Sequence, residues 1–307
     1  MKKTHGDEGA ASPRHSQEDA GEKYLLLVAA TAPELRVALA ALPGGEAVQI
    51  PKHPPPVFRE RRASGLPALP VLARKSSAIR CLVCGVGSTA AALSLGLYLG
   101  LNGEDRPAGV INCGYAGSYD LERAPLGSVV LALSEHLPEY GVWPESDETV
   151  VLKQRWAKDK DAARFPSPGG RGFPLPLPLP QTCLESGPVF TRLELFPDRA
   201  MAELGLGNQD ITGYNEKDCQ PVLRGASATV TGVSGSARRA ARMASLSGAL
   251  VENMEGFALA LACAAAGIPF IELRSVSNKA GTPLRKRNLY AADTALSCAV
   301  LRLLGQL

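Results

Sequence analysis

Residues 251–278 read VENMEGFALALACAAAGIPFIELRSVSN, and this stretch decides the fold. The run from Phe257 to Ala266 is apolar on nearly every side and rich in Ala and Leu, which predicts a helix buried on most faces. Gly267 ends that helix, and a turn at Ile268-Pro269 follows. Phe270 to Val276 then has the length and composition of a central parallel strand, so the stretch predicts a helix, a tight turn and a strand.

Polar residues stand at the two ends of this unit. Glu255 lies at the helix start, and Arg274 to Asn278 lie at the carboxyl end of the strand. Ligands of open α/β sheets bind at the carboxyl ends of strands. We expect a preceding strand near Ala228–Val233, which would begin the helix at that same edge. A carboxylate, a guanidinium and a carboxamide would then meet in one pocket, a set that suits a ribose and a purine.

Two further segments repeat the alternation of strand and helix. Tyr24–Ala30 predicts a buried strand, after which Thr31 and Glu34 can form a capping box at a helix start. Ile79–Cys84 predicts another strand, and Gly109–Gly117 predicts a strand that ends in a glycine turn whose backbone amides could approach a ligand. Strands that alternate with helices indicate one α/β domain.

The segments AATAPEL, GVGSTAAA, NCGYAG, VENMEGFALA and RSVSN, in this order and spacing, resemble the purine nucleoside phosphorylase and nucleosidase superfamily. Within it, the chain most resembles the futalosine hydrolases of the menaquinone pathway, which are relatives of the methylthioadenosine/S-adenosylhomocysteine nucleosidases. The resemblance covers residues 23–307 as a single nucleosidase domain. It implies a three-layer α/β/α sandwich with a mixed, partly barrel-like sheet, cleavage of an N-ribosidic bond without a cofactor, and a homo-oligomer, dimer or larger.

The resemblance also assigns roles by position. Glu34 matches the acid that activates water, Glu255 the acid that holds the ribose hydroxyls, and Met254 the residue that packs against the sugar. Asn278 stands where adenine-specific nucleosidases carry Asp, so hypoxanthine is the favoured leaving base. The other expected substrate-binding residues are Arg274, Ser277, Tyr115, Ala116, Gly117 and Val233.

Each of these residues also has a structural interpretation, and two other functions stay open. Glu34 could be only a capping acid, and Glu255 a first-turn acid favoured by the helix dipole. Arg274 could be a structural ion-pair partner of Glu272 or Glu255, and Asn278 an ordinary turn residue. Phosphorolysis is a close rival, although Glu34 would repel phosphate and Arg36 should project away from it. A catalytically silent nucleoside-binding protein would need no acid at Glu34.

A second glycine motif, Gly85-x-Gly87-x-x-Ala90, follows a predicted strand as a dinucleotide fingerprint would. Such a fingerprint needs an acid at the end of the next strand, but Glu104 and Asp105 lie in the polar stretch LNGEDRPAG, which predicts a loop. Close packing of a helix on a strand is therefore the better interpretation of these glycines.

Composition excludes several other classes. The chain has 307 residues, 45% of them hydrophobic, and a net charge of +3, which is too small to indicate a nucleic-acid partner. The seven cysteines with no export signal predict a reducing, cytoplasmic location. Cys81 and Cys84 form a CxxC inside a strand, where their side chains point to opposite faces, so no metal site is expected. No apolar run is long enough for a membrane span.

Three segments fall outside the expected core. Residues 1–22 are polar and charged and predict a disordered tail. Two Pro-rich segments, near 51–70 and 165–180, predict irregular structure, and the alternating Leu and Pro of the second one favour polyproline II.

Overall fold

A computed structural model describes residues 24–40, 42, 71–73, 78–103, 105–140, 191–206 and 222–304. The predicted N-terminal tail, 1–22, and the Pro-rich segments 51–70 and 165–180 lie outside the described residues. None of the described helices combines the length and apolar composition needed to cross a membrane.

The described residues form nine strands and six α-helices with one short 3-10 helix. The strands are β1 (Tyr24–Ala29), β2 (Val71–Ala73), β3 (Ala78–Val83), β4 (Gly109–Ser118), β5 (Val129–His136), β6 (Arg192–Glu194), β7 (Val222–Thr229), β8 (Val251–Asn253) and β9 (Phe270–Lys279). The helices are α1 (Ala32–Ala40), α2 (Ser88–Leu101), α4 (Pro197–Glu203), α5 (Ala237–Ser247), α6 (Gly256–Ala266), the 3-10 helix η3 (Leu284–Lys286) and α7 (Leu289–Leu304).

All nine strands belong to one mixed sheet. Its main path runs β2-β3-β1-β4-β8-β7-β5-β6, and β9 pairs with both β4 and β5. The pairing of β9 with β4 is parallel, whereas its pairing with β5 is antiparallel. Strands β4, β8, β7, β5 and β9 therefore close into a ring, and the prediction of a mixed, partly barrel-like sheet is confirmed.

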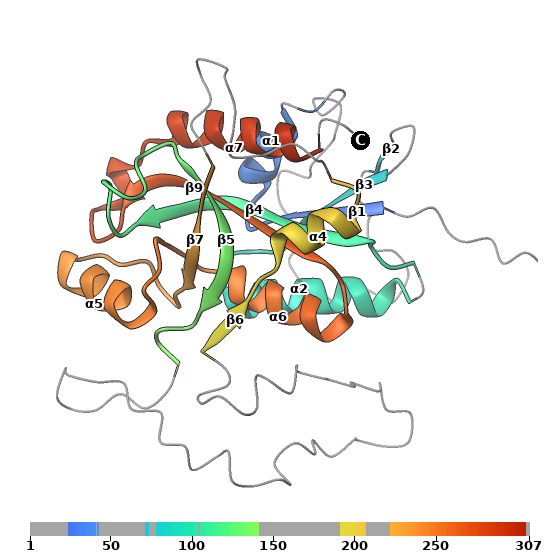
Figure 1. Ribbon diagram of the computed structural model, residues 1–307, viewed down its shortest axis with the longest axis horizontal. Coiled ribbons are helices and arrows are strands. Elements are labelled where there is room, and N and C mark those ends of the chain that lie inside the picture. Colours follow the sequence, from blue (N-terminus) through green and yellow to red (C-terminus); the bar gives the residue numbers. More distant parts are fainter. Residues whose placement is uncertain are drawn as a thin grey trace, which may run out of the picture.

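Helices cover the sheet on both faces, as Figure 1 shows, with α1 and α7 on one side and α2 and α6 on the other. Alternate residues of β1 feed two separate apolar cores, because successive side chains of a strand point to opposite faces. Leu25 and Leu27 pack with α1 and α7, whereas Leu26 and Val28 pack with α2 and α6. The predicted three-layer α/β/α arrangement is therefore confirmed.

The helix and the strand predicted from residues 251–278 are both present, and the strand is three residues longer at its carboxyl end than the predicted Phe270–Val276. Helix α6 ends at Ala266, and Gly267 adopts the left-handed conformation, with φ of 67°, that favours glycine. Strand β9 extends through Lys279, because its polar residues Ser275 and Ser277 are buried and their hydroxyls donate to backbone carbonyls.

The prediction of a strand near Ala228–Val233 directly before α6 is wrong. Strand β7 ends at Thr229, and the strand that directly precedes α6 is β8. The chain leaves the sheet after Val230 because the Glu252 side chain accepts hydrogen bonds from Ser234 N at 2.8 Å and Ser234 Oγ at 2.6 Å, which holds the following loop.

The prediction of a glycine turn at the end of Gly109–Gly117 is also wrong. Strand β4 continues through this segment to Ser118, with a register shift between Ala116 and Gly117. Neither Gly114 nor Gly117 has a positive φ. Both are glycine because neighbouring side chains occupy the space of a Cβ, as the site geometry makes clear.

Candidate active site

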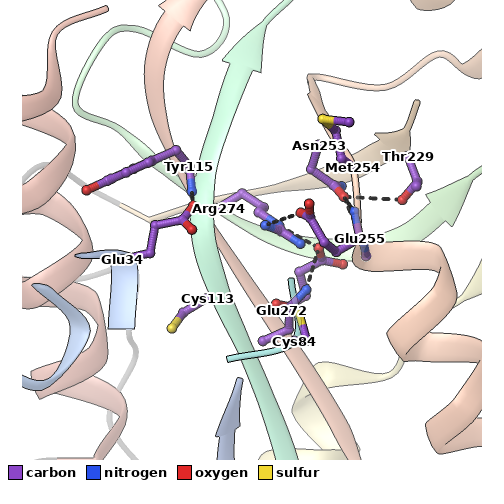
Figure 2. A network of polar contacts seen from close by, with 12 residues as sticks. Glu34, Cys84, Cys113, Tyr115, Thr229, Asn253, Met254, Glu255, Glu272 and Arg274 are labelled. Atoms are coloured by element: carbon purple, nitrogen blue, oxygen red, sulfur yellow. Dashed lines mark hydrogen bonds and ion pairs between the residues drawn. The ribbon is translucent and has the colours of Figure 1, made fainter. Parts of the chain in front are cut away.

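Two of the three predicted catalytic residues, Glu34 and Glu255, lie on either side of the predicted substrate-binding residue Arg274. Glu34 lies in the first turn of α1, Glu255 directly precedes α6, and Arg274 projects from β9 between them. Figure 2 shows Glu34 and Tyr115 on one side of Arg274 and Glu255 on the other. The turns after β1 and β8 and the middle of β9 thus bring distant segments of the chain together.

Glu34 acts as a capping residue and also faces the site. Its Oε2 accepts from Thr31 N at 3.0 Å and from Thr31 Oγ1 at 2.6 Å, while Thr31 Oγ1 accepts from Glu34 N at 3.4 Å. This is the predicted capping box. Its other oxygen, Oε1, accepts from Tyr115 N at 3.1 Å. One carboxylate oxygen is therefore committed to the helix start, and the second points toward β4.

Glu34 and Arg274 both pack against the backbone of Gly114, where a side chain would otherwise stand. A Cβ at this position would lie 2.9 Å from Glu34 Oε1 and 2.9 Å from Arg274 Nη1. Distances under about 3.0 Å are not tolerated by real Cβ atoms, so any side chain here would displace the carboxylate or the guanidinium. The absence of a side chain at Gly114 therefore lets an acid and a cation approach the same point of β4.

Arg274 is fully buried, with 1% of its surface exposed, and two acids balance its charge. Its Nε donates to Glu272 Oε1 at 2.7 Å, and Nη1 lies 3.5 Å from Glu255 Oε2. Burial alone would lower the pKa of Arg274, but the charges of Glu272 and Glu255 raise it, so the guanidinium stays charged. Its Nη2 has no hydrogen-bond partner among the described residues, which leaves a buried donor available to a ligand.

Glu255 is held from two directions. Its Oε1 accepts from the backbone N of Gly87 at 2.9 Å, and its Oε2 faces Arg274. Close packing around Gly85 is present as predicted, because a Cβ there would lie 3.0 Å from the Cβ of Ala90. The contact of Gly87 with Glu255 was not predicted, and it makes this glycine loop part of the site.

Asn278 lies further along β9, beside Gly117. The bulge in β9 is at Ser277, whose Oγ donates to Asn278 Oδ1 at 3.0 Å. Asn278 Nδ2 donates to Lys279 O at 3.1 Å, and a Cβ on Gly117 would lie 3.2 Å from Nδ2 and 3.3 Å from Glu252 Cγ. Gly117 therefore allows Asn278 and Glu252 to approach each other closely.

The other predicted substrate-binding residues lie around this edge in different environments. Met254 is half-buried, and its carbonyl accepts from Ser88 Oγ at 3.0 Å. Ala116 is buried between strands, whereas Val233 is 39% exposed in the loop after β7. Tyr115 contributes its backbone N to Glu34, but its hydroxyl donates to Asp293 on α7, away from Arg274.

Sequence reasoning missed three polar residues that support this edge: Asn253, Glu252 and Glu135. The first two lie within the quoted motifs. Glu272, which the sequence suggested as an ion-pair partner of Arg274, precedes it by two residues, so both side chains lie on one face of β9 and the ion pair is present. Glu135 had no such signal, because it comes from a strand far earlier in the chain.

Cysteines near the site are thiols held in apolar packing. Cys81 and Cys84 belong to the apolar cores on opposite faces of the sheet, as the strand spacing predicted. Burial, and then the charge of Glu255, raise the pKa of Cys84 to about 12. Within the described ranges, His, Cys, Asp and Glu form no group of three or more arranged to hold a metal ion.

Solved structures of similar fold include nucleosidases. Futalosine hydrolase of Helicobacter pylori has a TM-score of 0.59 at 15% identity, covering 93% of this chain and 99% of that one. The methylthioadenosine/S-adenosylhomocysteine nucleosidase of Colwellia psychrerythraea, in complex with adenine, has a TM-score of 0.55 at 17% identity, covering 93% and 96%. The nucleosidase of this name from Helicobacter pylori has a TM-score of 0.59 at 17% identity, covering 94% and 100%.

Among curated proteins, no sequence matches the chain. The model of one family, described as the phosphorylase superfamily, matches residues 36–304. This match spans most of the chain. The chain belongs to the phosphorylase superfamily.

Proposed function

We propose that the protein hydrolyses the N-ribosidic bond of a purine nucleoside, and that futalosine is its substrate, with hypoxanthine and dehypoxanthine futalosine as the products. The observation that carries this proposal is the convergence of three side chains: Glu34 Oε1 and Arg274 Nη1 both approach Gly114, and Arg274 Nη1 lies 3.5 Å from Glu255 Oε2. A general base and an acid that can hold ribose hydroxyls would then lie at one strand edge.

The chemistry of the bond explains why such residues are needed. Cleavage builds positive charge on the sugar and negative charge on the departing base. Glu34 Oε1 would take a proton from water, whose oxygen forms the new bond to C1′ as the bond from C1′ to the purine breaks. The carboxylate of Glu255 would stabilise the positive sugar more strongly in the transition state than in the ground state.

The departing purine keeps the electron pair of the broken bond. Asn278 Nδ2 would donate a hydrogen bond to this base, and solvent would supply the proton that the neutral purine carries. An amide at this position can match a 6-oxopurine, which supports hypoxanthine over adenine as the leaving base. This is the same argument that the sequence supplies, and the buried position of Asn278 beside Gly117 agrees with it.

Phosphorolysis is the alternative that the geometry supports less well. A phosphate bound beside Glu34 would place its negative charge against this buried carboxylate. Arg274 could attract phosphate, but Glu272 and Glu255 already balance its charge. Arg36 is exposed on α1, whereas Glu34 is buried, so these two side chains leave the helix on different faces. Water is therefore the better nucleophile for this site.

A panel of nucleosides tests the proposal. Futalosine, its 6-amino analogue aminodeoxyfutalosine, methylthioadenosine and inosine are each incubated with the protein in phosphate-free buffer, and the released base is identified by chromatography. We expect hypoxanthine from futalosine at the highest kcat/KM. If every nucleoside raises the thermal stability of the protein and none is cleaved, the protein is a nucleoside-binding protein and the proposal is wrong.

A further inference from the structure

Beneath the turn that carries Glu255 lies a buried polar network that the proposed reaction does not use directly. It joins Glu135 on β5, Thr229 on β7 and Asn253 on β8. Glu135 has 0% of its surface exposed and lies in contact with no solvent. A buried acid without a counter-charge is costly, so its presence here calls for a physical reason.

Asn253 connects this network to the backbone at the start of α6. Its Oδ1 accepts from Glu255 N at 2.9 Å and from Gly256 N at 2.7 Å, which satisfies two of the donors that a helix start leaves without partners. Thr229 Oγ1 accepts from a third such donor, Phe257 N, at 2.8 Å. The orientation of the Asn253 amide therefore fixes the backbone from which the Glu255 side chain projects.

Glu135 determines that orientation. Its Oε1 accepts from Asn253 Nδ2 at 2.7 Å, and Ser227 Oγ accepts from the same nitrogen at 2.7 Å. Its Oε2 lies 2.6 Å from Thr229 Oγ1, the hydroxyl that also lies 3.2 Å from Asn253 Oδ1. Glu135 thus binds the Asn253 amide nitrogen directly and contacts the Thr229 hydroxyl that binds the amide oxygen. If the amide were turned over, both hydrogen bonds would be lost.

A second acid, Glu272, approaches the same point from β9. A Cβ on Gly256 would lie 2.4 Å from Glu135 Oε1 and 2.4 Å from Glu272 Oε1, so the two carboxyl groups face each other across this glycine. Arg274 is the cation that touches Glu272, and it also serves Glu255. Arg274 thus contacts two of these three buried acids, Glu272 and Glu255, and the nearby charge of Glu272 disfavours a second negative charge on Glu135.

The surroundings of Glu135 favour its protonated form. Burial raises its pKa well above the ordinary value, the charge of Glu272 raises it further, and the hydrogen bond from Thr229 and the charge of Arg274 oppose the shift. The ionisable groups that act on it are Glu272 and Arg274, both from β9; Thr229 and Ser227 of β7 and Asn253 of β8 are neutral. A protonated Glu135 still accepts from Asn253 Nδ2 through Oε1. The Thr229 hydroxyl, which donates to Oε2 in the structure, can turn to accept from a proton on that oxygen.

The geometry points to Glu135 as a positioning residue, which acts through Asn253 to hold the turn at Met254–Gly256 and so places Glu255 for the reaction. This inference rests on the function proposed above, since it gives Glu135 a role in the cleavage step. Displacement of a catalytic group by about 1 Å can reduce a rate by about 10²-fold. Glu135 therefore contributes to catalysis without touching the substrate.

Two substitutions whose side chains have about the length of glutamate test the role of the Glu135 carboxyl group. Glu135→Gln keeps a neutral acceptor and a donor, and we expect kcat within about threefold of the unchanged protein. Glu135→Met keeps the length and removes both groups, and kcat should fall by about tenfold to a hundredfold, with a smaller change in KM. Leu131→Ala, on the opposite face of β5, is the control for a general loss of core packing, and its kcat should stay close to that of the unchanged protein.

Two readouts do not depend on turnover. In the infrared spectrum, the carbonyl stretch of a protonated carboxylic acid should be present in the unchanged protein and absent in Glu135→Gln. By NMR, the side-chain amide protons of Asn253 should exchange slowly with solvent and lose this protection in Glu135→Met. These measurements stay informative if Glu135→Met folds poorly, because the infrared comparison uses only the unchanged protein and the Gln variant.

The results separate this inference from the proposed function. Full kcat in folded Glu135→Met, an equal loss in the Gln and Met variants, or a missing acid band would each overturn the role of Glu135. A protein that cleaves no nucleoside but shows the acid band and the protected Asn253 amide would instead contradict the proposed function and leave the network as described.

Discussion

Glu34→Gln is the substitution that separates the catalytic role of Glu34 from its role in the capping box. Three donors point at the carboxylate: Thr31 N, Thr31 Oγ1 and Tyr115 N. Glutamine offers one accepting oxygen and one NH₂ group. The Thr31 hydroxyl can turn to accept from that NH₂ group, but one of the two backbone N–H groups must then face a donor.

The structural cost follows from that mismatch. Leaving a buried donor without its acceptor costs about 1 to 3 kcal/mol, which corresponds to a decrease in Tm of roughly 2 to 6 °C for a chain of this size. The catalytic cost should be larger, since an amide cannot take a proton from water. Removal of a general base lowers kcat by about 10² to 10⁴, and we expect a loss in that range with little change in KM.

Thr31→Ala is the matched control, because it removes the hydroxyl of the capping box and leaves the carboxylate in place. It should lower stability by about 1 kcal/mol and reduce kcat by less than about tenfold. Thermal unfolding and chromatographic assay of the released base measure both quantities in each variant. A Glu34→Gln protein with kcat within about threefold of the unchanged protein would refute the general-base role.

Three further predictions follow from the same geometry. Gly114→Ala places a Cβ 2.9 Å from Glu34 Oε1 and from Arg274 Nη1, which must displace one of these side chains. The kcat should therefore fall by about tenfold or more in the base-release assay, and an unchanged kcat would show that their approach to Gly114 does not matter for the reaction. The unchanged protein should prefer futalosine to its 6-amino analogue and Asn278→Asp should narrow the ratio of kcat/KM values; equal or faster turnover of the amino compound by the unchanged protein would contradict this preference. Because the pKa of Glu135 is raised in the folded protein, its contribution to stability is complete below the ordinary value of 4.5 and is lost as the pH rises toward the folded value. Glu135→Gln should therefore gain thermal stability relative to the unchanged protein as the pH increases from about 4 to 7, and a constant difference across this range would show that Glu135 does not hold its proton.

The parts of the fold that the sequence predicts are those with strong local signals. The apolar run of α6 and the glycine after it determine that helix, and β1 is a continuous apolar segment. Strand β8 was missed because three residues are too few to show a strand period. Closure of the sheet into a ring depends on pairing between β9 and two other strands, which no local pattern encodes.

The candidate site divides in the same way. Glu255 and Arg274 stand in recognisable motifs, and the structure brings them within 3.5 Å. The sequence alone cannot distinguish a glycine that makes a turn from one that admits a neighbouring side chain, and Gly114 is of the second kind. Glu135 contacts Asn253 across 118 residues of sequence, so its role depends on the completed sheet.

The most direct test of the account is the dependence of base release on phosphate. Futalosine is incubated with the protein in phosphate-free buffer and again with added phosphate, the purine is measured by chromatography, and the sugar product is examined by ³¹P NMR. We predict equal rates in both buffers, with hypoxanthine and a free sugar as the products. Release that requires phosphate and yields a sugar 1-phosphate would contradict the assignment of Glu34 as the base that activates water.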